Sequence, residues 1–151
     1  MKLPYREGTW FAVPLRTGGY AVGLVSRATI NGKVIFCYFF GPRRTSVPTL
    51  SDVENFKAIS AVKLARVGDL ALIRREWPIV GHSTLWKRSD WPMPPFVRRS
   101  ELSGKAWRVH HSNSDPTAID REEPEPYEST LERDSVFGAG AMELVLTNLL
   151  S

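Results

Sequence analysis

The stretch Val34-Ile35-Phe36-Cys37-Tyr38-Phe39-Phe40 decides the fold of this chain. Successive side chains of a strand point to opposite faces, so this uninterrupted run makes both faces apolar. Such a run is typical of a central strand that is buried on both sides, whereas a strand with one face in water alternates apolar and polar residues. We therefore expect a fully buried central strand here, with Cys37 as a small buried hydrophobe and not a reactive thiol.

The segments before this run predict two strands that pair with it. Residues 9–26 look like a hairpin, because two β-prone segments flank the turn signal Thr17-Gly18-Gly19. Asn31-Gly32 is a strong hairpin turn that leads into the central run. The three strands form an antiparallel meander, in which Gly23 indicates a bulge or a close approach of another group to the backbone.

The middle of the chain predicts shorter elements. An N-cap signal precedes residues 52–58, which can form a short helix at best. Residues 61–67 are typical of a strand with Val62 inside and Arg66 outside or nearly so. After a turn at Gly68-Asp69, we expect residues 70–73 to continue as a strand.

The rest of the chain adds two strands, a polar segment and a helix. Residues 77–82 are typical of an edge strand and residues 105–110 of another strand, whereas residues 112–135 predict a loop, a clamped arm or a partly disordered segment. Residues 140–150 predict an amphipathic helix. Its apolar stripe consists of Met142, Val145, Leu146 and Leu149.

These elements predict the fold class α+β, mainly β. We expect a bent antiparallel sheet or a small SH3-like barrel, with one short helix and a C-terminal helix; an open sheet is the alternative to the barrel. The length of 151 residues favours a single domain over residues 1–151, with an acidic loop or arm at about residues 112–135.

Charge is distributed unevenly along the chain, although the net charge is only +4. Residues 1–111 hold 18 Lys and Arg against 7 Asp and Glu, a balance of +11, and residues 112–151 hold 2 against 9, a balance of −7. Such asymmetry indicates either a charged partner or an acidic arm that folds onto a basic body. The chain has no apolar run of membrane-spanning length and no signal-like N-terminus, so we expect a cytoplasmic protein that does not contact a membrane.

The residue types needed for catalysis or metal binding are sparse. The chain has one cysteine, three histidines, no Gly-x-Ser-x-Gly sequence and no phosphate-binding loop. His110 and His111 are adjacent, so on a strand they point to opposite faces, and we expect both to be surface or edge residues. The sequence therefore predicts a protein that is not an enzyme and holds neither a metal nor a cofactor.

The acidic segment supplies the candidate partner-binding residues. Eight acids fall within residues 115–134, against only Arg121 and Arg133. Such a segment can mimic a phosphate backbone and steer a basic partner, and a tyrosine among the acids can anchor it. The alternative is that the acids only solvate a linker or neutralise the basic body. The candidates are Asp120, Glu122, Glu123, Glu125, Tyr127 and Glu128.

Four groups of residues carry a family resemblance. They are Gly8–Leu15 followed by Gly19–Gly23, Gly68-Asp69-Leu70 with Trp77–Gly81, Pro95-Phe96, and Gly138–Glu143 with Leu149-Leu150. In their order and spacing they resemble the immunity protein 26 family of bacterial polymorphic toxin systems. The resemblance implies a cytoplasmic antidote to a secreted toxin, but it does not name the toxin. Immunity proteins commonly occlude a toxin's active site, and the acidic segment favours a basic toxin domain, such as a nuclease or deaminase, as the partner.

A nucleic-acid-binding module is the alternative from another class of function. Basic residues accompany aromatic ones at Trp86-Lys87-Arg88, and pairs of arginines occur at residues 43–44, 74–75 and 98–99. Small β-barrels bind single strands by stacking bases on aromatic side chains beside a positive groove. The acidic segment argues against this alternative, because it would repel phosphate or cover the basic surface.

Overall fold

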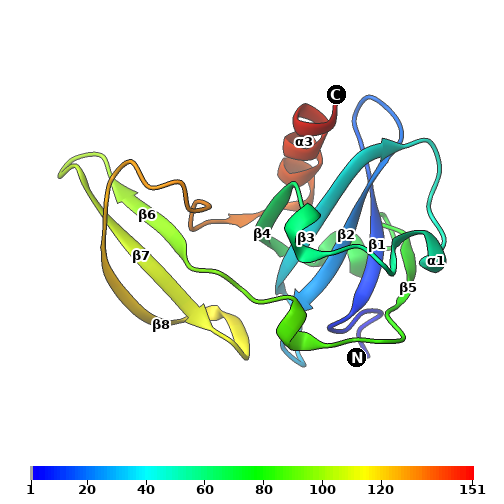
Figure 1. Ribbon diagram of the computed structural model, residues 1–151, viewed down its shortest axis with the longest axis horizontal. Helices are drawn as coiled ribbons and strands as arrows, with labels where there is room; N and C mark the ends of the chain where they lie inside the picture. The colour runs from blue at the N-terminus through cyan, green and yellow to red at the C-terminus, as the bar shows by residue number, and fades with distance from the viewer. Residues whose placement is uncertain (1) are drawn as a thin grey trace.

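A six-stranded sheet with β3 (Val34–Arg44) near its centre forms the body of the computed structural model, which describes residues 2–151 (Figure 1). The strand order is β5-β1-β2-β3-β4-β9. All neighbours are antiparallel except β4 and β9, which are parallel. The other five strands are β1 (Thr9–Pro14), β2 (Tyr20–Arg27), β4 (Lys63–Gly68), β5 (Ile79–His82) and β9 (Val136–Phe137).

A second sheet of three antiparallel strands lies beside the body, at the left of Figure 1. Its order is β6 (Phe96–Ser100), β7 (Lys105–Ser112) and β8 (Asp115–Glu125). The chain enters this sheet from the body after the 3-10 helix η2 (Arg88–Asp90) and returns through residues 126–135 to β9. The remaining helices are α1 (Leu50–Val53), η1 (Ala58–Ser60), α2 (Leu70–Ile73) and α3 (Ala139–Leu150).

The central strand is buried on both faces, as its sequence predicts. Ile35, Cys37 and Phe39 belong to one core cluster, and the alternate residues belong to the other. Burial raises the pKa of the Cys37 thiol well above its usual value, because the thiolate cannot be hydrated there. Cys37 is therefore the buried hydrophobe that the sequence predicts.

The first core lies between the sheet and α3. Trp77 stacks on Phe11, with their ring centroids 5.5 Å apart, and its indole nitrogen donates a hydrogen bond of 2.8 Å to Glu143 of α3. Met142 and Leu146 are buried against the sheet, but Leu149 is half exposed, so its predicted place on the buried stripe is wrong. Leu150 takes that place and packs against the first core, because it follows Leu146 by four residues and lies on the same face of α3, whereas Leu149 is turned away from it.

The second core lies on the opposite face of the sheet. Trp10 packs edge-on against Trp91 at a centroid distance of 5.8 Å, and Phe96 of β6 packs edge-on against Phe36 at 6.0 Å. Tyr38 donates a hydrogen bond to the carbonyl of Pro92, and burial raises the pKa of its hydroxyl to about 12. The second sheet therefore contributes a side chain to the core of the body.

Several predicted boundaries and orientations differ from the structure. The helix predicted at 52–58 is α1, which covers only Leu50–Val53, and residues 70–73 form α2 instead of continuing a strand. The register of β4 against β3 pairs Arg66 with Phe36, so Arg66 is buried, and Val62 lies before the strand and is exposed. The prediction for these two residues is wrong because their orientation depends on that register and on the second sheet that covers Arg66.

The strand pairing also decides the predictions about the topology of the sheet and about residues 112–135. The meander of β1, β2 and β3 and the edge position of β5 are confirmed, and the sheet is open, with β5 and β9 at its edges. Of the three alternatives for residues 112–135, a loop, a clamped arm or a partly disordered segment, the loop and the disordered segment are wrong for the first half, because residues 115–125 form β8. A strand at the edge of a sheet needs only backbone pairing on one side, so its side chains can all be polar.

Gly23 is the position where the core tolerates no side chain. A Cβ atom there would lie 2.2 Å from the ring of Phe11, which itself is stacked on Trp77. We expect Gly23→Ala to lower the free energy of unfolding by about 1–3 kcal/mol, because the ring has no room to move. Urea denaturation measures this, with Gly68→Ala as the control: its Cβ would meet no atom closer than 3.9 Å, and the expected change is within about 0.5 kcal/mol. Equal changes in the two variants would contradict this account of the core.

Candidate partner-binding surface

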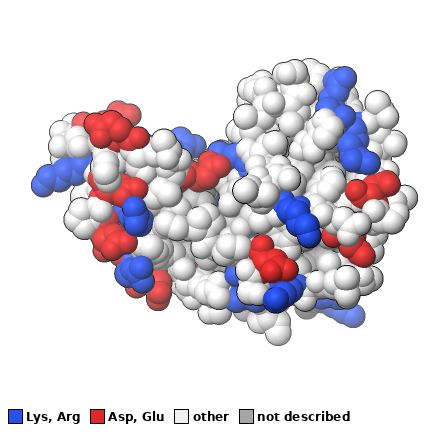
Figure 2. All heavy atoms as spheres, in the orientation of Figure 1, with Lys and Arg blue, Asp and Glu red and all other residues white. Residues whose placement is uncertain are grey.

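The candidate residues lie on the second sheet and the segment that follows it, which together we name the wing (residues 96–135). The wing holds nine Asp and Glu against six Lys and Arg, a balance of −3, so the rest of the chain carries +7. Acidic and basic side chains are interleaved on the visible face of the wing, at the left of Figure 2. Positive charge on the body and negative charge on the wing are therefore less separated than positive and negative charge are along the sequence.

A buried group of three charged or polar side chains attaches the wing to the body. Arg66 of β4 donates to Asp134 at 2.7 Å and to the carbonyl of Pro116 at 3.1 Å. His111 of β7 lies 2.7 Å from the same oxygen of Asp134. The side chains of Arg66, His111 and Asp134 are at most 9% exposed. The prediction of a surface position is therefore wrong for His111, because Asp134 and Arg66 give its imidazole a polar partner inside the junction.

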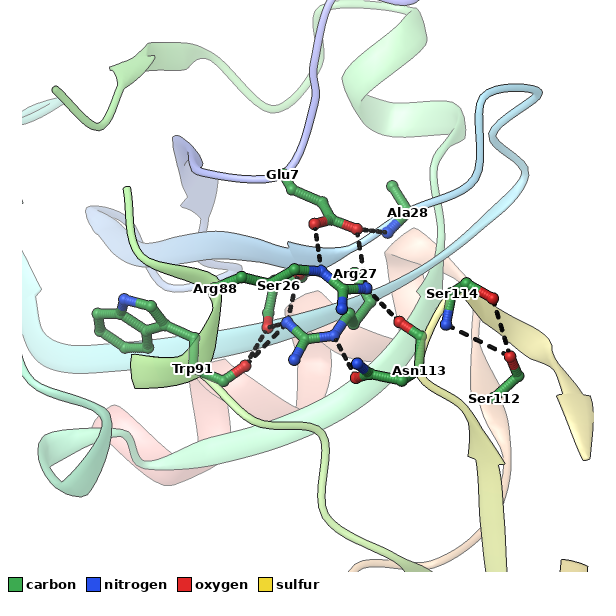
Figure 3. Close-up of polar contacts among 9 residues, drawn as sticks. All are labelled: Glu7, Ser26, Arg27, Ala28, Arg88, Trp91, Ser112, Asn113 and Ser114. Atoms are coloured by element: carbon green, nitrogen blue, oxygen red, sulfur yellow. Dashed lines mark hydrogen bonds and ion pairs between the residues drawn. The ribbon is translucent and has the colours of Figure 1, made fainter. Parts of the chain in front are cut away.

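A second polar cluster holds the turn between β7 and β8 (Figure 3). The buried guanidinium of Arg27 donates to Asn113 at 2.8 Å, to Ser26, and to the carbonyl of Trp91 at 3.0 Å. Burial lowers the pKa of Arg27, and the positive charge of Arg88 lowers it further. Arg88 completes the cluster by donating to the carbonyl of Asn113.

Glu7, from the segment before β1, supplies the carboxylate of this cluster. It accepts a hydrogen bond of 2.7 Å from Arg88 and lies near Ala28 (Figure 3). Arg88 and Asn113 therefore connect the N-terminal segment to the wing. Together with the buried group at Arg66, this cluster fixes the wing at two separate points.

Three of the predicted acids are paired with basic residues of neighbouring wing strands. Glu122 accepts from Arg98 at 2.8 Å, and Glu125 accepts from Arg108 at 3.0 Å. Glu123 lies 2.7 Å from His110, and the hydrogen bond between them lowers the pKa of this glutamate. Because of these partners, most of the negative charge of β8 is balanced within the wing.

Tyr127 is held against β6 by an arginine. Arg99 donates to its carbonyl at 2.6 Å, and the guanidinium carbon of Arg99 lies 5.7 Å from the centre of its ring. The ring is half-buried, so part of it faces solvent. The structure therefore makes Tyr127 an aromatic group of fixed position, which is what an anchor for a partner requires.

Asp120 and Glu128 are the two predicted acids that are exposed and have no ion-pair or hydrogen-bond partner within residues 2–151. Asp120 lies where the register of β7 and β8 shifts between His110 and His111, so no residue of β7 stands opposite it. The structure thus divides the predicted set into paired acids, one anchored tyrosine and two free acids.

Sequence reasoning assigned Arg98 to a possible nucleic-acid surface and missed its contacts within the wing. Arg98 and Trp107 face each other across β6 and β7, with the guanidinium carbon 4.7 Å from the indole centre. Arg98 also pairs with Glu122, so the three side chains form one row across the wing. The sequence predicts the strand at residues 105–110, but it does not indicate which residue of β8 stands opposite each position.

The outer edge of the wing is the free side of β8. Segment 132–134 pairs with the other edge, since Val97 of β6 donates to the carbonyl of Glu132 at 2.9 Å and accepts from Asp134 at 2.8 Å. The order across the wing is therefore segment 132–134, β6, β7 and β8. Pro116 and Pro124 lie in β8, and prolines are typical of strands at an open edge.

Within residues 2–151, no three His, Cys, Asp or Glu side chains are grouped closely enough to hold a metal ion. No helix in the same residues has the length and apolar character needed to cross a membrane. Of the five tryptophans, Trp10, Trp77 and Trp91 are buried in the two cores. These three cannot stack on bases, whereas Trp86 and Trp107 are half-buried.

The fold and this surface define a mainly β scaffold that carries a rigid charged wing. A family model described as Immunity protein 26 matches residues 6–108, about two thirds of the chain. The chain therefore belongs to the immunity protein 26 family, as the resemblance indicates, and its function is that of an immunity protein. No curated protein and no solved structure matched the chain.

The junction at Asp134 generates a test of how the wing is attached. Asp134→Asn leaves Arg66 buried without its carboxylate, so we expect the free energy of unfolding to fall by about 3 kcal/mol or more. Glu122→Gln is the matched control, because its pair with Arg98 is about half exposed and is worth less than about 1 kcal/mol. Urea denaturation gives both values, and equal small losses would show that the buried group does not hold the wing.

Proposed function

We propose that this protein neutralises a cognate toxin by laying its wing over the toxin's active site. The family makes it an immunity protein, and an immunity protein that acts by occlusion needs an exposed surface of fixed shape. The wing supports this role because two buried polar clusters, at Arg66 and at Arg27, hold it to the body. In this proposal the protein performs no chemical step, since covering the active site is sufficient.

The single observation that carries the proposal is the position of the two free acids on the wing. Asp120 and Glu128 are exposed and have no partner in the described part of the chain, so no ion pair neutralises their charge directly. The acids that are paired with Arg98, Arg108 and His110 contribute less, because each lies beside a cationic or hydrogen-bonding neighbour. An unbalanced negative surface favours a toxin with a basic cleft, such as one that acts on nucleic acid.

The extent of the family match agrees with this placement. The match ends at residue 108, within β7, so β8 and residues 126–135 lie beyond it. Residues that select one toxin among many are expected to lie outside the features that a family shares. Half-buried Tyr127 and the free acids all belong to this part of the chain.

Charge reversal at the two free acids tests the proposal. We expect the double variant Asp120→Lys/Glu128→Lys to lower the association rate with the toxin domain encoded beside this gene by about tenfold or more at low salt. The rate should also lose much of its salt dependence, since the variant removes the attraction that salt screens. Stopped-flow or surface-plasmon measurements over a range of salt concentrations give both quantities.

The control for this experiment is Glu76→Lys, which reverses an exposed charge on the body. We expect the control to keep the rate and the ability to rescue cells that express the toxin. Unchanged binding by the wing variant, with both variants folded as judged by circular dichroism, would refute the wing as the interface.

A further inference from the structure

A pocket of about 450 Å³ opens on the body, outside the wing and beside the second core. Its walls contain four aromatic side chains, from Trp10, Phe56, Trp86 and Trp91. Two carboxylates, of Glu54 and Asp90, also line it. The volume lies in the range of sites that hold a small ligand or a single large side chain.

The indole nitrogen of Trp10 is buried in the wall of this pocket without a hydrogen-bond acceptor in residues 2–151. Trp77, the other fully buried tryptophan, donates to Glu143. A buried donor without a partner costs about 1–3 kcal/mol, so native proteins rarely keep one. Trp10 is only 1% exposed, so an occupant of the pocket meets mainly the half-buried ring of Trp86.

The charges of the pocket favour a cation. Glu54 accepts a hydrogen bond of 3.0 Å from Thr84, which leaves its second carboxylate oxygen free, and Asp90 has no side-chain partner in the described residues. Lys57 is the one cationic side chain among the lining residues, so the carboxylates exceed it by one. Aromatic faces attract ammonium and guanidinium groups through their quadrupoles, and nearby carboxylates strengthen this attraction.

The walls are held in place before any ligand arrives. Trp10 meets Phe56 edge-on at 5.9 Å and Trp91 edge-on at 5.8 Å. The carbonyl of Trp91 accepts hydrogen bonds from Ser26 and Arg27, the cluster that also holds the wing (Figure 3). Ligand binding therefore requires little ordering of the protein. Leu85, which is 83% exposed, lies at the pocket and offers apolar contact to a larger partner.

We propose that this pocket binds one arginine or lysine side chain of the toxin. The cationic group lies against the half-buried ring of Trp86 and pairs with Glu54 and Asp90. This inference rests on the proposed function, because it takes the toxin as the partner. It adds a second contact on the body to the contact made by the wing.

A titration with single amino-acid derivatives tests the pocket without the toxin. The probes are Nα-acetyl-arginine amide and Nα-acetyl-lysine amide, with Nα-acetyl-citrulline amide as the uncharged analogue of arginine. We expect a cationic probe to shift the indole N–H resonance of Trp86 in two-dimensional NMR spectra of the full chain, while the resonance of Trp77 stays in place. Equal shifts with citrulline, or no shift with either cation, would overturn the proposal.

The double variant Glu54→Gln/Asp90→Asn gives the second readout. It preserves the shape of both side chains, and we expect it to weaken binding of the cationic probe and of the toxin by about tenfold each. Glu76→Gln is the matched control and should change neither affinity.

The toxin measurement separates failure of the pocket from failure of the proposed function. If the pocket variant binds the toxin as tightly as the unchanged chain while the wing variant binds more weakly, the pocket proposal fails and the wing proposal stands. If the pocket variant binds the toxin more weakly and the wing variant does not, the pocket proposal stands and the wing is not the interface.

Discussion

The structure depends on the burial of β3 on both faces. Residues 35–40 have almost no contact with water, so each face of the sheet must be covered by other parts of the chain. Helix α3 covers one face, and the segment from Trp91 to Phe96 covers the other. Because Phe96 is also the first residue of β6, covering this face places the wing beside the body and fixes where it begins. The fold of the body and the position of the wing therefore both follow from the need to cover the two faces of β3.

Much of the body was predictable because its signals are local. The run at 34–40, the turns that precede it and the apolar residues of the C-terminal helix each indicate their own structure. Arg66, His111 and Asp134 could not be placed in this way, since each is buried only because the other two are near it. Their sequence separations are large, and an isolated arginine, histidine or aspartate in a β segment indicates a surface position. The buried junction is a property of the tertiary structure.

The candidate site likewise combines residues that the sequence identifies with contacts that only the tertiary structure determines. The sequence identifies the acids, but the pairing of Glu122, Glu123 and Glu125 depends on the register of β8 against β7, which shifts twice near His111. The composition of this segment favours a loop, whereas the structure makes it an edge strand whose acids face basic residues on the neighbouring strands. The surface of the wing is therefore less acidic than the sequence suggests, and of the predicted acids only Asp120 and Glu128 are exposed without a partner in residues 2–151.

Amide hydrogen exchange of the protein, free and bound to its toxin domain, tests the central claim most directly. No strand within residues 2–151 pairs with the outer edge of β8, and residues 126–131 follow β8 in the chain. The account predicts that toxin binding slows exchange over residues 117–131, with little change in α3 and β9. Protection confined to α3, β4 and β9, with exchange across the wing unchanged, would contradict it.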